Sequence, residues 1–76
     1  MKALLETFAR ELVDEPDRVS VTQFDEGDGF FLELSVAPED RGFVIGKRGR
    51  TADALRTVLD AVARRRGTSC DMEIVD

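Results

Sequence analysis

The chain has 76 residues with 16 acidic and 11 basic side chains, which give a formal net charge of −5. A chain of this length is expected to form one domain, residues 1–76, around a small core. It contains no histidine and a single cysteine, which excludes an internal disulfide and removes the commonest general base and metal ligand. No apolar run approaches the ~18 residues of a membrane span, and charge returns too early for a secretory signal. We therefore expect a cytoplasmic protein.

The charge is distributed unevenly along the chain. Residues 1–40 carry 3 basic and 11 acidic side chains, a net of −8, whereas residues 41–66 carry 8 basic and 2 acidic side chains, a net of +6. Residues 67–76 add a net of −3. The overall acidity argues against a nucleic-acid partner, but a ligand senses the charge within a Debye length of roughly 8–10 Å. The cationic segment is either a functional patch or a solvated helix face, and its concentration favours a patch.

Hydrophobic periodicity predicts the elements of the first half. Apolar residues recur at helical spacing over residues 2–14, and Pro16 ends this helix. Alternation of apolar and polar residues predicts one strand over 19–24 and a second over 30–36. The turn at 25–29 contains two glycines, so the two strands are expected to form an antiparallel hairpin.

The second half is predicted to return through helices to a last strand. Pro38 opens a short helix that Gly46 and Gly49 interrupt, a longer amphipathic helix spans 50–66, and a strand covers 70–75. A helical return between two strands favours their parallel pairing. The order α-β-β-α-α-β therefore predicts an α+β fold, with a three-stranded mixed sheet and its helices packed on one face.

The long helix has two contrasting faces in this interpretation. Its buried face is expected to contain Leu55, Val58, Leu59 and Val62. On the opposite face, two acids have the i,i+3 and i,i+4 spacing of surface ion pairs, Asp53 with Arg56 and Asp60 with Arg64.

Residues 42–51, which read GFVIGKRGRT, carry the candidate chemistry. They are not a P-loop, because only three residues separate Gly42 from Gly46. They also fail the dinucleotide fingerprint G-x-G-x-x-G, because Val44 stands where the second glycine is needed. What remains is a G-x-x-G string between two helices, where glycines let a ligand approach the backbone and the next helix N-terminus attracts phosphate. Alone, this string is a weak signal, and a simple helix–helix turn would also explain it.

In this context the segment Val44–Arg50, followed by Ala54-Leu55-Arg56, resembles the signature of KH domains of the bacterial type II arrangement. The resemblance covers the whole chain and is strongest for small single-domain bacterial KH proteins of the KhpA type. It implies a cytoplasmic RNA-binding protein, an RNA chaperone or post-transcriptional regulator, whose loop clamps about four nucleotides of single-stranded nucleic acid. The RNA-binding residues that it implies are Gly46, Lys47, Arg48, Gly49, Arg50, Val44, Arg41 and Arg56.

The resemblance also implies partners. A single KH module offers a small site, so useful affinity calls for a homodimer or for pairing with a larger KH protein of the Jag or KhpB type. Two other functions stay open: binding of single-stranded DNA, and a KH scaffold that acts only by protein interaction. Phe24 and Phe31 are expected on the open face of the sheet with Val75, either as a partner surface or as a local cross-strand pair.

No catalytic residue, cofactor, metal site, small-molecule substrate or membrane partner is expected. The serines have no histidine to act as their base, so nucleophilic catalysis is not predicted. The acids of residues 25–28 lack the spacing of a calcium loop. Cys70 follows the buried alternation of the last strand and is expected to be a small core residue.

Overall fold

The structure is a computed structural model that describes residues 1–75, and its element order is the one predicted. Short 3₁₀ turns at Pro16–Arg18, Pro38–Asp40 and Lys47–Gly49 connect the main elements. These elements are α1 (Lys2–Leu12), β1 (Ser20–Glu26), β2 (Gly29–Ser35), α2 (Arg41–Ile45), α3 (Arg50–Arg65) and β3 (Ser69–Ile74).

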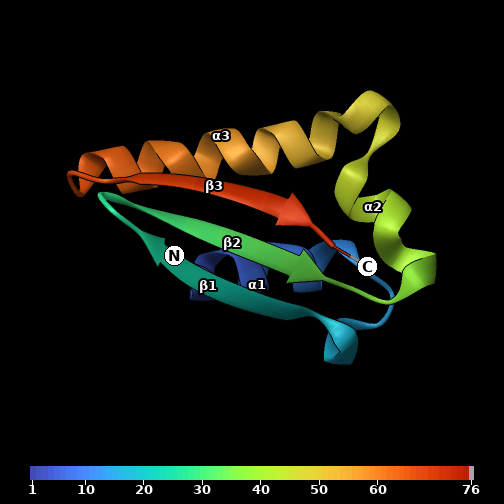
Figure 1. The fold of residues 1–76 in the computed structure, drawn as a ribbon. Helices are drawn as coiled ribbons and strands as arrows, with labels where there is room; N and C mark the ends of the chain where they lie inside the picture. Colours follow the sequence, from blue (N-terminus) through green and yellow to red (C-terminus); the bar gives the residue numbers. More distant parts are fainter. Residues whose placement is uncertain (76) are drawn as a thin grey trace.

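The three strands form one mixed sheet in the order β1-β2-β3 (Figure 1). β1 pairs antiparallel with β2, and β2 pairs parallel with β3. In Figure 1, α1 lies behind β1 and β2 while α3 runs along β3, and α2 leads to the turn at the start of α3. The predicted mixed sheet with its parallel pair is confirmed.

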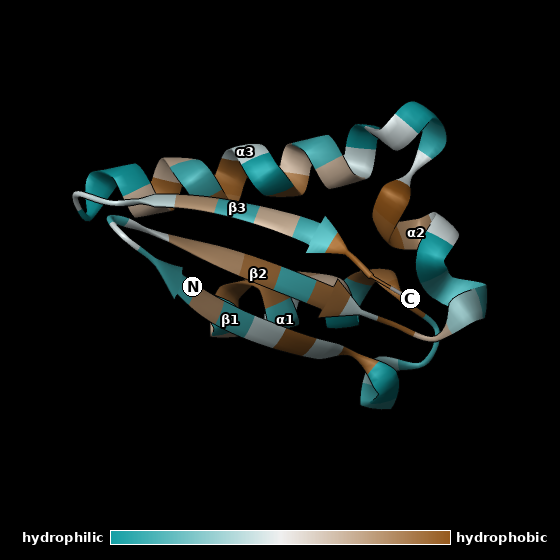
Figure 2. Ribbon diagram, in the orientation of Figure 1, coloured by the Kyte–Doolittle hydropathy of each residue, from teal (hydrophilic) through white to brown (hydrophobic). Residues whose placement is uncertain are grey.

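The core lies between the sheet and the helices, and Figure 2 shows apolar residues along the strands and helices that enclose it. Alternate strand residues face the helices because successive side chains of a strand point to opposite faces. The largest fully buried apolar side chains are Leu5, Leu32, Leu34, Leu59, Met72 and Val44. No helix among residues 1–75 is long and apolar enough to cross a membrane.

The buried face of α3 differs in part from the prediction. Leu55 and Leu59 are buried as expected, and Ala63 extends this line at i+4 spacing. Val58 was expected in the core but is 42% exposed. Its side chain forms one wall of an apolar groove between α1 and α3, because α1 does not cover it.

The register places Phe24 directly opposite Phe31 on the open face of the sheet. Phe24 is 43% exposed and Phe31 is partly buried, so the predicted placement of this pair is confirmed. Val75 does not join them. The parallel register pairs Phe31 with Asp71, so Val75 follows four residues further along, beyond the end of β3.

One buried carboxylate fixes the approach to α2. Asp40 is 1% exposed, and its Oδ2 accepts a hydrogen bond from the Glu15 N–H at 3.0 Å. The bond joins the connection after α1 to the residue before α2. A buried polar group needs such a partner, because an unpaired one costs about 1–3 kcal/mol. Asp40 therefore helps to set where α2 and the following turn lie.

Candidate nucleic-acid interface

The G-x-x-G segment forms a tight turn between α2 and α3. The Gly46 N–H donates to the Gly42 carbonyl at 2.9 Å, and the Gly49 N–H donates to the Gly46 carbonyl at 3.1 Å. Gly46 has φ 76° and ψ 171°, a region that only glycine occupies readily, and Gly49 is left-handed at φ 74°. Arg48 is left-handed as well, at φ 59°. The turn is thus held in a conformation that depends on its glycines.

Gly46 also allows close packing against α3. A Cβ atom at this position would lie 2.2 Å from Thr51 Oγ1 and 2.8 Å from the Thr51 backbone nitrogen. A Cβ atom at Gly49 would meet nothing within 4 Å. The two glycines therefore differ: Gly46 is required by space and by φ, whereas Gly49 is required by φ alone. This packing holds Lys47 and Arg48 at the N-terminal end of α3.

The N-terminus of α3 is open to an anion. The helix has 16 residues, and no side chain caps its first turn, where Gly49 is the N-cap residue. The first N–H groups of a helix have no partner within the helix and carry the positive end of its dipole. Lys47, Arg48 and Arg50 are all exposed around this end. Three cations and a free helix N-terminus together suit phosphate oxygens.

A groove of about 380 Å³ runs beside this turn, between α2, α3 and β3. Ile45, 40% exposed at the end of α2, forms part of its apolar surface with Ala52 and Ile74. The polar lining residues are Arg48, Asp53, Arg56 and Glu73. An apolar surface next to donors and acceptors fits the flat face and polar edge of an unstacked base.

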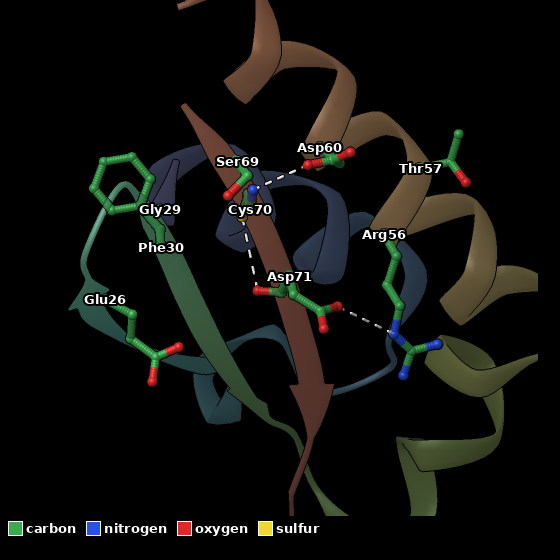
Figure 3. A pocket seen from close by; sticks show the side chains of 9 residues that line it. All are labelled: Glu26, Gly29, Phe30, Arg56, Thr57, Asp60, Ser69, Cys70 and Asp71. Atoms are coloured by element: carbon green, nitrogen blue, oxygen red, sulfur yellow. Dashed lines mark hydrogen bonds and ion pairs between the residues drawn. The ribbon is translucent and has the colours of Figure 1, made fainter. Parts of the chain in front are cut away.

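Arg56 lies between this groove and a second hollow along the edge of β3, and it lines both (Figure 3). Its Nε donates to the Met72 carbonyl at 3.1 Å and lies 3.9 Å from Asp71 Oδ1. Its Nη1 donates to Asp53 Oδ1 at 3.1 Å, which confirms the predicted ion pair. These contacts hold the guanidinium at the edge of the groove.

The second predicted ion pair is also confirmed, and it reaches β3. Arg64 Nε donates to Asp60 Oδ2 at 2.6 Å. The Cys70 N–H donates to Asp60 Oδ1 at 3.1 Å (Figure 3). Both bonds stabilise the charged carboxylate, so they lower the pKa of Asp60. Cys70 is buried as predicted, and burial raises the pKa of its thiol, which favours the unreactive neutral form.

The structure gathers most of the predicted RNA-binding residues at one place. Gly46 to Arg50 form the turn and the start of α3, and Arg56 lines the groove beside them. Val44 is fully buried, so it supports α2 from the core and offers no surface to a ligand. Arg41 lies at the other end of α2, and its Nε is shielded from solvent.

Sequence reasoning missed the apolar surface of the groove, which includes Ile45, Ala52 and Ile74. A signal existed for Ile45, because Val44 and Ile45 are adjacent and a short helix cannot bury both. Nothing local in the sequence shows that the end of β3 lies beside α3. That proximity depends on the parallel pairing of β2 with β3.

The element order, the sheet with helices on one face, and a G-x-x-G turn between α2 and α3 together define a KH domain of type II. The family model of the KhpA/KhpB KH domain matches residues 2–74. The chain belongs to this family.

Curated proteins from several bacteria are similar over their whole length. The chain is 49% identical to RNA-binding protein KhpA of Halalkalibacterium halodurans over 100% of both chains. It is 51% identical to RNA-binding protein KhpA of Clostridium acetobutylicum, over 99% of this chain and 100% of that one. It is 43% identical to RNA-binding protein KhpA of Streptomyces coelicolor, over 100% of this chain and 95% of that one. No solved structure is significantly similar to it.

Proposed function

We propose that this protein binds single-stranded RNA through the Gly46–Gly49 turn and the adjacent groove, as an RNA chaperone or post-transcriptional regulator. The observation that carries the proposal is the meeting of three exposed cations, an uncapped helix N-terminus and an apolar groove. The names of the KhpA relatives support it. Residues 1–76 act in this proposal as one non-catalytic KH domain in the cytoplasm.

The proposed binding mode separates backbone from bases. Phosphates lie against Lys47, Arg48, Arg50 and the first N–H groups of α3, and bases enter the groove beside Ile45. The acidic remainder of the chain, with a net of −8 over residues 1–40, repels any nucleic acid that leaves this track. Binding is therefore confined to one side of the molecule.

The first prediction concerns the salt dependence of the intact protein. With up to three cations on phosphates, the logarithm of the binding constant for a single-stranded RNA should fall with the logarithm of salt with a slope of roughly −2. Fluorescence anisotropy of a labelled oligonucleotide measures this slope. A slope near zero would show that the turn does not hold phosphates.

Competition in the same assay measures whether the protein prefers single-stranded RNA, single-stranded DNA or duplex RNA. Unlabelled RNA should displace the labelled strand more effectively than DNA of matched sequence. Equal or better displacement by DNA would favour the alternative of single-stranded DNA binding. Duplex RNA should compete poorly, because its bases are not free to enter the groove.

We propose in addition that two KH modules act together, as a homodimer or with a larger KH protein of the Jag or KhpB type. The supporting observation is the apolar groove of about 280 Å³ between α1 and α3, beside which Leu12 is 39% and Val58 is 42% exposed. The part of α3 that lines the groove includes two small residues, the partly buried Thr51 and the exposed Ala54, so a second α3 can approach closely. Two linked sites would raise the affinity of one small module.

The second prediction tests this face. Val58→Glu places a charge in the apolar groove, so a dimer of the purified protein should become a monomer in light scattering. RNA affinity should fall about tenfold or more through lost avidity, while circular dichroism stays unchanged because Val58 is outside the core. Thr57→Glu, at an exposed position about 100° around α3 from Val58 that does not line the groove, is the matched control. A wild-type protein that is monomeric at all concentrations would contradict the homodimer.

A further inference from the structure

The two edges of the sheet differ in how their backbone groups are covered. At the β3 edge, the Cys70 N–H donates to Asp60 Oδ1 at 3.1 Å, as Figure 3 shows. The Met72 carbonyl accepts from Arg56 Nε at 3.1 Å, and the Met72 N–H donates to Asp71 Oδ1 at 2.8 Å. These side chains occupy the groups that another strand would need. The β3 edge is therefore closed to strand addition.

β1 is the other edge, and the register identifies its outward groups. The Val75 N–H donates to the Leu34 carbonyl at 2.9 Å, so Leu34 directs its backbone groups toward β3. Val21 pairs opposite Leu34, and its N–H and carbonyl therefore point away from the sheet, as do those of Gln23 and Asp25. Among residues 1–75, no backbone hydrogen bond from another element reaches these three residues.

β1 lacks the lysine and proline residues that most often protect an edge strand, and its two charged residues, Asp25 and Glu26, lie at its end. Ser20–Glu26 contain no lysine, arginine or proline, and six of the seven residues are exposed. Proteins normally block such an edge, because its unpaired N–H and carbonyl groups attract other strands. An open edge of this length is suited to receive a strand from a partner protein. In such a complex, backbone hydrogen bonds between the two strands supply affinity.

The open face next to this edge determines which partner fits. Phe24 and Phe31 lie opposite each other at its centre, and aromatic rings attract cations over their faces. Four carboxylates lie on this open face, because their positions alternate along the strands with those of the residues that face the helices. No strand residue on this face has a basic side chain. These carboxylates belong to Glu26, Glu33, Asp71 and Glu73. The face therefore favours a cationic ligand.

We propose that the β1 edge receives an extended, basic segment of another protein as an added strand. Its arginine or lysine side chains would lie over Phe24 and beside Glu26 and Glu33. RNA is disfavoured by the carboxylates, and a second copy is disfavoured because residues 1–40, which include β1, have a net charge of −8. β2 and β3 separate this edge from the Gly46–Gly49 turn, so the inference does not depend on RNA binding.

The test uses the full chain and labelled synthetic peptides. The fluorescence anisotropy of a labelled peptide of alternating arginine and threonine should rise when the protein is added. The same peptide with glutamate in place of arginine should show no rise. Methylation of alternate backbone amides in the arginine peptide should weaken binding about tenfold, because it removes strand pairing and keeps the charge. Equal binding of the methylated peptide would overturn strand addition and leave only charge attraction.

Protein variants locate the site. Gln23→Pro removes an N–H that points away from the sheet, so no hydrogen bond to β2 is lost, and an edge strand tolerates proline at such a position. This variant should bind the peptide about tenfold more weakly. Gln23→Thr keeps the N–H and is its control. Glu33→Lys should also weaken binding several-fold, whereas Asp17→Lys makes the same change of charge at an exposed position outside the sheet and should have less effect.

Three outcomes would overturn the proposal. The first is peptide affinity that is unchanged in both Gln23→Pro and Glu33→Lys. The second is a set of peptide-induced amide NMR shifts that fall on residues 45–51 and spare β1, which would place the peptide on the proposed RNA surface. The third is a change of oligomeric state in Gln23→Pro with no change in peptide affinity, which would make the edge a contact between copies.

Discussion

Lys47→Asp/Arg48→Asp is expected to reduce affinity for single-stranded RNA about 100-fold or more at moderate salt, because each change turns a phosphate-binding cation into a repelling anion. Both side chains are exposed, so the core is unaffected. The two new aspartate carboxylates would also lie at the N-terminal end of α3, where they interact favourably with the helix dipole. The protein should therefore stay folded while it loses RNA, as anisotropy and circular dichroism would show together.

The matched control for this variant is Lys2→Asp/Arg10→Asp. It makes the same change of net charge on α1, at two exposed positions outside the groove and the turn. Its RNA affinity should fall only a few-fold, through the general field of the protein. If both double variants lose affinity equally, binding follows net charge and does not require the turn.

Gly46→Ala is expected to have the largest effect on stability of any single change in the turn. The added Cβ meets the side chain and the backbone nitrogen of Thr51, and alanine is strained at φ 76° and ψ 171°. Backbone strain and the contact together should lower the free energy of unfolding by about 2–4 kcal/mol. Urea unfolding followed by circular dichroism measures the loss, and RNA binding should fall because the turn is displaced.

Two other glycines provide a graded comparison. Gly49→Ala meets no atom within 4 Å but retains the left-handed φ of 74°, so it should cost about 1 kcal/mol. Gly42→Ala lies within α2, also meets no atom within 4 Å, and should be neutral or stabilising by up to about 1 kcal/mol. If the three variants rank in a different order of unfolding free energy, steric contact and backbone φ do not act at this turn as described.

The fold was largely predictable because each element has a clear local signal. The period of α1, the alternation of β2 and the glycines of the turn each indicated one structure, and together they fixed the topology. The strand ends moved by one or two residues, since local patterns do not define where a ladder begins. β1 ends at Glu26 and β2 begins at Gly29, so the turn is shorter than the predicted 25–29. Val58 was misplaced because helical period alone does not show how far α1 extends over α3.

The candidate site was predictable only in its cationic half. Lys47, Arg48 and Arg50 are adjacent in the sequence, so their clustering required no tertiary information. The groove required it, because Ile45 and Ile74 are distant in the chain and meet through the parallel pairing of β3. Arg56 was named from the motif, but its bond to the Met72 carbonyl depends on the same pairing.

The most direct test of RNA binding through the turn is an NMR titration of the isotope-labelled protein with a short single-stranded RNA. If RNA binds through the turn, amide shifts should concentrate in residues 45–51 and at the groove residues Arg56, Glu73 and Ile74. The amides of β1 and of α1 should remain unchanged. Shifts confined to the sheet face or to the α1/α3 groove, or no shifts at all, would contradict RNA binding through the turn.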